Sequence, residues 1–71
     1  MPKRIIYYAI DEESGEIIGS TNTDCVGKNL TEIGLSLDRI INNKNGFHNN
    51  VNGSYSFCVF KKIDTNYIGR I

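Results

Sequence analysis

The sequence predicts an α+β domain in which a short helical segment covers one face of a small antiparallel β-sheet of about four strands. Two pairs of segments rich in Ile, Tyr, Phe and Val are each joined by a short polar turn, as in β-hairpins. Between the pairs lie two short segments with apolar residues at helical spacing. The order hairpin, helical crossover, hairpin predicts one such domain over residues 1–71.

The first hairpin is predicted close to the N-terminus. Arg4–Ile10 is rich in Ile and Tyr and predicts a strand that is apolar on both faces, so we expect it in the middle of the sheet. The acidic residues, Ser and Gly of Asp11–Gly15 favour a turn. Glu16–Ser20 is therefore predicted to return as the second strand of the hairpin.

A polar loop and a single helical turn are predicted next. Thr21–Gly27 is polar and is expected to form a loop. In Asn29–Ile33 the apolar residues Leu30 and Ile33 are three positions apart, which places both of them on the inner side of one helical turn. Gly34 is expected to end this turn.

A second short helix is predicted to begin after Ser36. The Ser side chain is a good acceptor for the free amides at a helix start, and Asp38 in the first turn suits the helix dipole. The helix is expected to stop near residues 42–45. Its apolar face is predicted to hold Leu37, Ile40 and Ile41.

The second hairpin is predicted after an asparagine-rich segment. Asn42–Ser54 holds six asparagines and two glycines and is expected to be a mobile surface loop. Tyr55–Ile63 predicts the strongest strand, and Asp64–Asn66 predicts the turn into a last strand, Tyr67–Ile71. Two alternating sets leave open which face of the strong strand points inward: Tyr55, Phe57 and Val59, or Ser56, Cys58 and Phe60.

Composition narrows the classes of function. Eight Lys and Arg residues balance eight Asp and Glu residues, so nucleic acid is not an expected partner. No hydrophobic run approaches the roughly 20 residues that cross a bilayer, and we expect no membrane contact by this segment. A domain of this size buries only about 60% of the surface that its unfolded chain exposes, so we expect a homodimer or a place in a longer protein to add stability.

No catalytic or metal-binding pattern is present in the sequence. Cys25 and Cys58 lack the neighbouring Cys or His that a zinc site needs, and both are expected to be free thiols. His48 has no identifiable nucleophile or carboxylate partner. Gly27–Lys28 lacks the earlier Gly of a phosphate-binding loop, because position 22 is Asn. We therefore expect a protein that is not an enzyme and needs no cofactor.

Several segments in this order resemble the Cache family, PAS-like sensor domains of bacterial chemoreceptors, sensor kinases and cyclic-di-nucleotide enzymes. The chain lacks the long N-terminal helix of that family. The resemblance implies a PAS-like sheet in a signal-transduction protein, which is extracytoplasmic if the chain is part of a membrane sensor and cytoplasmic if it is the whole protein. The matching segments are Tyr8–Asp11, Gly15–Ile18, Ser20–Thr21, Asp24, Val26–Leu30, Gly53–Tyr55 and Tyr67–Gly69.

The resemblance also implies a ligand pocket between the sheet and the crossover loops, for an amino acid, a carboxylate or an amine. Tyr8, Tyr55 and Phe57 are its predicted walls, with the opposite face of the strong strand as the alternative. Arg39 is the first choice to pair with a ligand carboxylate, and Lys28 is the second. Asp64 would accept a ligand ammonium group.

Each of these site residues also has an ordinary structural explanation. Arg39 has the pattern of a solvated helix residue, Asp64 that of a turn residue, and Tyr8 that of a core aromatic residue. The sequence therefore leaves a second function open. In that alternative, the chain is a small interaction or dimerisation module whose exposed sheet edge pairs with a partner strand.

Overall fold

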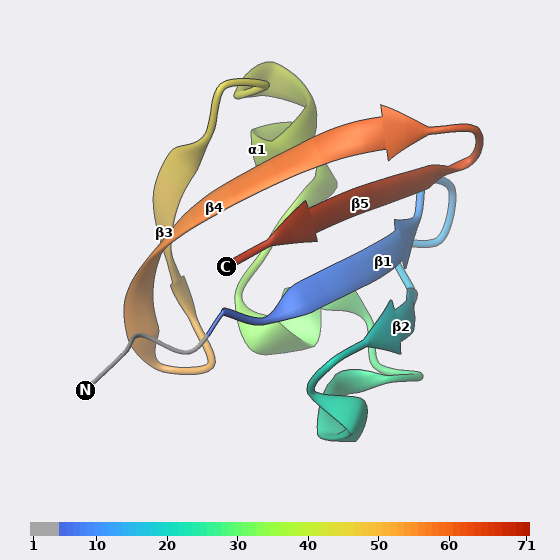
Figure 1. The fold of residues 1–71 in the computed structure, drawn as a ribbon, viewed down its shortest axis with the longest axis horizontal. Helices are drawn as coiled ribbons and strands as arrows, with labels where there is room; N and C mark the ends of the chain where they lie inside the picture. The colour runs from blue at the N-terminus through green and yellow to red at the C-terminus, as the bar shows by residue number, and fades with distance from the viewer. Residues whose placement is uncertain (1–4) are drawn as a thin grey trace.

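One antiparallel sheet dominates the structure, a computed structural model that describes residues 5–71 (Figure 1). The first residue of the predicted strand Arg4–Ile10 lies outside the described residues. The sheet has five strands in the order β2-β1-β5-β4-β3. The strands are β1 (Tyr7–Asp11), β2 (Ile17–Ser20), β3 (Phe47–Val51), β4 (Ser54–Ile63) and β5 (Asn66–Arg70).

The predicted α+β class is wrong, because the protein is mainly β. The crossover between β2 and β3 contains two short 3₁₀-helices and one α-helix of a little over one turn, and it passes behind the sheet in Figure 1. Such short helices have little stability of their own and depend on tertiary packing. Each buries only one or two side chains. The three are η1 (Thr23–Cys25), η2 (Leu30–Ile33) and α1 (Leu37–Asn42).

The prediction of about four strands is also wrong, because the asparagine-rich segment contains β3. This strand buries its first and last residues, Phe47 and Val51, and pairs with β4 along its whole length. The turn between the two strands is Asn52–Gly53, with φ of 52° and 82°. Asn-Gly is the preferred pair for a two-residue hairpin turn with positive φ. The segment predicted as a mobile loop is therefore half of a hairpin.

The first hairpin forms as predicted. The Asp11 carboxylate accepts hydrogen bonds from the Ser14 backbone amide at 2.8 Å and from the Ser14 hydroxyl at 2.9 Å, which closes the turn. These hydrogen bonds lower the pKa of the Asp11 carboxyl group. β1 lies between β2 and β5, as its apolar composition indicates. Its two faces are unequal, however, because Tyr8 is buried whereas Tyr7 is half exposed.

Two of the three helical turns, η2 and α1, lie where the sequence predicts them, whereas η1 forms within Thr21–Gly27, which was predicted to be a loop. Asn29 caps η2 by accepting a hydrogen bond from the Thr31 amide at 3.1 Å, and Gly34 ends it with φ of 100°. The Ser36 hydroxyl accepts a hydrogen bond from the Arg39 amide at 3.2 Å, which confirms the predicted N-cap of α1. The predicted apolar face of α1 is wrong at Ile41, which is 45% exposed.

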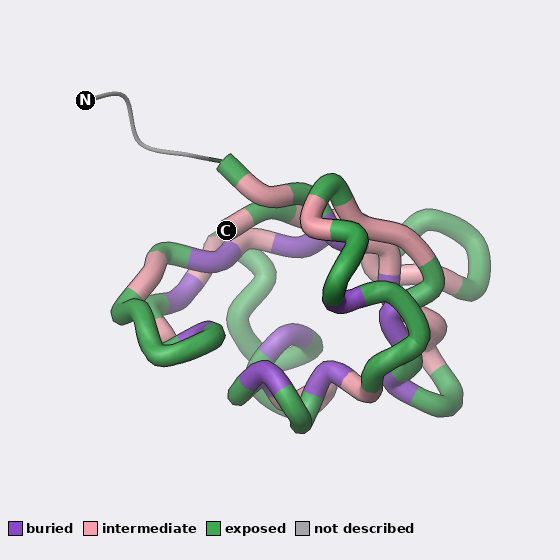
Figure 2. The backbone as a smooth tube through the Cα atoms, turned by 90° about the horizontal axis from the view of Figure 1, so that it is seen from below, coloured by how far each residue is buried: buried purple, intermediate pink, exposed green. Residues whose placement is uncertain are grey.

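The core lies between the sheet and the crossover. Buried segments of the two layers face each other in Figure 2. The inner face of β4 carries Ser56, Cys58 and Phe60, which decides between the two sets that the sequence left open. Both cysteines are free thiols, as predicted. The core residues are Tyr8, Ile10, Ile17, Cys25, Leu30, Ile33, Leu35, Ile40, Phe47, Val51, Cys58 and Phe60.

Replacing Gly34 by alanine is expected to destabilise the protein by about 2–3 kcal/mol. A Cβ atom at this left-handed position would be strained and would lie 2.5 Å from the Asn50 carbonyl oxygen of β3. Gly53→Ala is the matched control, since Gly53 also has positive φ but nothing lies near the added Cβ atom. It should cost only about 1 kcal/mol. Urea unfolding of both variants measures the difference, and equal losses would contradict a close contact at Gly34.

Candidate functional site

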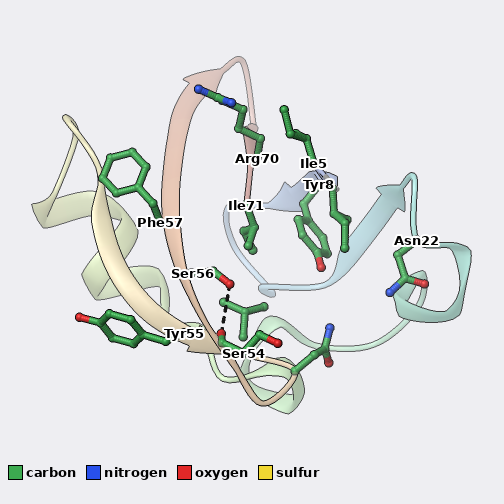
Figure 3. Close-up of a pocket in the computed structure, with 12 residues that line it drawn as sticks. Ile5, Tyr8, Asn22, Ser54, Tyr55, Ser56, Phe57, Arg70 and Ile71 are labelled. Carbon is green, nitrogen blue, oxygen red and sulfur yellow. Dashed lines mark hydrogen bonds between the residues drawn. The ribbon is translucent and has the colours of Figure 1, made fainter. Parts of the chain in front are cut away.

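A cavity of about 560 Å³ opens between β1 and the first half of β4 (Figure 3). Its floor is formed by the Asn52 turn and by the loop around Asn22, which precedes η1. Its lining mixes aliphatic side chains with neutral polar ones. The lining residues are Ile5, Ile6, Tyr8, Asn22, Val51, Asn52, Ser54, Tyr55, Ser56, Phe57, Arg70 and Ile71.

Tyr8 supplies the most unusual polar atom of the cavity. The side chain is only 2% exposed, and its hydroxyl has no hydrogen-bond partner among the described residues. Figure 3 shows this hydroxyl pointing into the space between β4 and Asn22. Burial, assisted by the neighbouring Cys25 thiol, raises the pKa of Tyr8 to about 12. The group is therefore a neutral O–H donor at physiological pH.

The other polar side chains around the cavity are neutral as well. The Ser56 hydroxyl donates to the Ser54 carbonyl oxygen at 3.1 Å, and the Asn52 amide lies 3.8 Å from the Cys25 sulfur. Arg70 is exposed and pairs across the sheet with Tyr7 on the outer face, and its guanidinium points away from the cavity in Figure 3. The described walls therefore offer hydrogen bonds and apolar contact. The positive charge of Arg70 lies outside the cavity.

The side chains of Tyr55 and Phe57 do not form the cavity walls that the sequence predicts. Their rings point away from it in Figure 3, on the outer face of β4. There they pack against His48 of β3, with ring centroids 5.4 Å and 5.1 Å from the imidazole. The two residues still belong to the lining of the cavity. The inner set of side chains, which includes Ser56, faces it instead.

The predicted charged site residues lie away from the cavity. The Arg39 guanidinium donates to the His48 carbonyl oxygen at 2.9 Å and covers the Phe47 ring at 5.3 Å. Asp64 lies in the turn between β4 and β5, at the opposite end of β4 from the cavity, with φ of 55°. Lys28 is exposed and does not line the cavity. Of the five predicted site residues, only Tyr8 directs its side chain into the cavity.

Asn52 and Ser54 were missed as site residues, whereas Ser56 belongs to the alternative set that the sequence left open. The available signal was the alternation of β4, since small hydroxyl residues at two inward positions leave space beside a buried Tyr. The sequence could not show that these positions face Tyr8, because β1 and β4 are not neighbours in the sheet.

Residues 5–71 contain no group of His, Cys, Asp or Glu side chains placed to hold a metal ion. Burial raises the pKa of the Cys58 thiol, which keeps it protonated. In the same range, no helix has the length and apolar character required to cross a membrane. Comparison with family models, with curated proteins and with solved structures gives no match to this chain.

Proposed function

We propose that the chain is a non-catalytic sensor module that binds a small ligand in the cavity beside Tyr8. The observation that carries this proposal is the buried Tyr8 hydroxyl without a partner among the described residues. Leaving a buried hydroxyl unpaired costs about 1–3 kcal/mol. A ligand that accepts its hydrogen bond would recover that energy, which favours binding. The Cache-like segments support the proposal, because two of them contain Tyr8 and Ser54.

The neutral walls restrict the ligand. An amino acid, carboxylate or amine would need to keep its charge in solvent at the mouth of the cavity and place an uncharged group against Tyr8. Burying an unpaired charged group of the ligand inside the cavity would cost more free energy than the hydrogen bond from Tyr8 contributes. Sensing additionally requires that the ligand bind two conformations unequally. The loop at Asn22 and the turn at Asn52 border the cavity and would close over such a ligand.

Tyr8→Phe is expected to weaken ligand binding while it stabilises the fold. Removing an unpaired buried hydroxyl should raise the free energy of unfolding of the ligand-free protein by about 1 kcal/mol. The same change should weaken any ligand that accepts the Tyr8 hydrogen bond by roughly tenfold. Thermal-shift screening of amino acids, short carboxylates, amines and neutral amides finds the ligand, and calorimetry on both proteins measures the loss.

The control for this experiment is Tyr55→Phe, which removes a hydroxyl from a side chain that is 71% exposed and points away from the cavity. It should change neither stability nor binding. A panel without a single stabilising compound, or a ligand whose affinity is the same for the Tyr8→Phe variant and the parent protein, would remove the support for the proposal.

A second candidate function, protein interaction through a sheet edge, is favoured by a different observation. β2 and β3 are the outer strands of the sheet, and no other described strand pairs with their outer edges. An uncovered strand edge is a template for pairing with another chain. Homodimerisation through such an edge would appear as a concentration-dependent mass in light scattering.

A further inference from the structure

Asparagine is followed directly by glycine at two positions of the chain, Asn45–Gly46 and Asn52–Gly53. In such a pair the asparagine side-chain amide is readily lost, because glycine has no side chain that hinders attack by its backbone nitrogen. Both asparagines are exposed, and both lie in turns that flank β3. The surrounding structure holds these two turns differently, so the two sites should not react alike.

The reaction needs only water and a proton acceptor from the solvent. The Gly46 nitrogen, for example, loses its proton and attacks the side-chain carbonyl carbon of Asn45. A carbon–nitrogen bond forms in a succinimide ring, the bond to the side-chain nitrogen breaks, and ammonia leaves with the proton. Water then adds to either ring carbonyl and opens the ring, which leaves aspartate or isoaspartate at the position of the asparagine.

Ring closure requires a backbone conformation that neither turn has. The glycine nitrogen must lie on the same side of the asparagine Cα–C bond as its own Cβ atom. Type I and type I′ turns both hold that nitrogen elsewhere. The asparagine must therefore rotate out of its turn before it reacts. Its rate then follows the fraction of molecules in which that turn is locally open.

The turn at Asn45 is weakly held. It joins α1 to β3, and among residues 5–71 one backbone hydrogen bond closes it, from the Gly46 amide to the Asn43 carbonyl oxygen at 3.0 Å. Neither Lys44 nor Asn45 has a positive φ, which makes this a type I turn. Opening it breaks that hydrogen bond and leaves the ladder between β3 and β4 intact.

The turn at Asn52 is held more firmly. Val51 and Ser54 on either side of it are paired in the β3–β4 ladder, and Val51 is buried. The Asn52 amide also donates to the Ile33 carbonyl oxygen of η2 at 3.0 Å, which ties the hairpin to the crossover. Opening this turn breaks the end of the ladder as well. Each additional net hydrogen bond reduces the open fraction about fivefold.

We propose that Asn45 is a site of spontaneous deamidation in the folded protein, where it becomes aspartate and isoaspartate, whereas the fold protects Asn52. Asn45 does not belong to the lining of the cavity beside Tyr8, so this inference is independent of the proposed function.

Modification of Asn45 changes the connection into β3. Both products add a negative charge, and isoaspartate also lengthens the main chain by one carbon atom before Gly46. Gly46 packs so closely against the Phe57 ring that a Cβ atom there would overlap it, and the next residue, Phe47, is buried. The extra carbon atom disturbs these contacts. Protein that carries isoaspartate at this position should therefore melt at a lower temperature than fresh protein.

Peptide mapping of aged protein tests the proposal. The protein is incubated in mildly alkaline buffer, either folded or in guanidinium chloride, and then digested with trypsin. Lys44 and Lys61 flank both sites with no Lys or Arg between them, so fragment masses must assign each product within the peptide 45–61. Digestion in heavy-oxygen water marks any deamidation that occurs during the digest. In the folded protein Asn45 should react at least about fivefold faster than Asn52, whereas in guanidinium chloride their rates should be similar.

Two substitutions test the chemistry and its control by the turn. Asn45→Gln should abolish the fast product, since the longer side chain closes its ring slowly, and the matched variant Asn52→Gln should leave that product unchanged. Lys44→Pro stiffens the turn, because proline is favoured at the second position of a type I turn. It should slow the reaction of Asn45 in the folded protein by about two- to fivefold and leave Asn52 unaffected.

Several outcomes would overturn the proposal. These are equal rates at the two sites in the folded protein, a faster reaction at Asn52, and a folded protein that reacts at neither site. A preference for Asn45 that is equally strong in guanidinium chloride would show that the fold does not protect Asn52. If Lys44→Pro folds and leaves the rate at Asn45 unchanged, opening of this turn does not control the reaction.

Discussion

Gly69→Ala is expected to destabilise the protein by more than about 3 kcal/mol, beyond the usual cost of overpacking. Gly69 lies on β5 between Tyr8 of β1 and Phe60 of β4. A Cβ atom there would overlap the Val59 carbonyl oxygen and the Phe60 ring. Neither can move away easily, because one belongs to the backbone of a central strand and the other is buried in the core. Circular dichroism during urea unfolding measures the loss.

Gly19→Ala is the matched control, since it adds the same methyl group to another strand glycine. Its Cβ atom would lie 3.7 Å from the Ala9 Cβ atom, an ordinary contact. The free energy of unfolding should stay within about 0.5 kcal/mol of the parent protein. If Gly69→Ala were equally well tolerated, the close approach of β5 to β4 would be wrong, and the position of the cavity beside these strands would lose its basis.

Ile10→Ala is expected to cost about 3–4 kcal/mol, the range for a large aliphatic side chain removed from a core. Ile10 is completely buried and belongs to β1, an interior strand of the sheet. A domain of this size has only about 4–10 kcal/mol of stability, so the variant should unfold well below the melting temperature of the parent. Thermal and urea unfolding give the difference directly.

The neighbouring strand provides the control for Ile10→Ala. Ile18→Ala removes the same atoms from a β2 side chain that is 47% exposed, and it should cost less than about 1 kcal/mol. Similar losses for the two variants would mean that the inner face of β1 is not the core face. The side of the sheet on which the cavity lies would then have to be reassigned.

Local hydrogen-bonding chemistry made several elements predictable. The Asp11 side chain closes its own turn, Asn29 and Ser36 cap their own helical turns, and Gly34 ends one of them in the left-handed conformation that glycine adopts readily. All of these interactions join residues only a few positions apart. They do not depend on the remainder of the fold, so composition and spacing reveal them.

The errors arose where packing between distant segments overrides local preference. Asparagine favours turns, yet β3 forms because Phe47 and Val51 are buried and because β4 supplies a complete ladder of partners. The helical segments were expected to form a helical layer, but each has so few buried side chains that it remains about one turn long. Arg39 was expected to meet a ligand, whereas its guanidinium caps a carbonyl of β3.

The candidate site was the least predictable part. Tyr8 was identified because a Tyr in an apolar strand suggests a pocket wall, but its unpaired hydroxyl depends on what surrounds the ring. Tyr55 and Phe57 were predicted to line the pocket because the sequence does not show which face of β4 points inward. They belong to the set that points outward. Their rings point away from the cavity, and the inward Ser56 beside them faces it instead.

The sequence by itself determined the turns at Asp11–Gly15 and Asp64–Asn66, the helical turns η2 and α1, and the extended segments of β1, β2, β4 and β5, because short-range hydrogen bonds and alternating side chains encode these features. Only the tertiary structure decided which face of β4 is buried and that β1 and β5 meet in the middle of the sheet. The position of the cavity between β1 and β4 follows from that pairing. Strand order and register depend on burying apolar surface across the whole molecule, and no local pattern along the chain records the result.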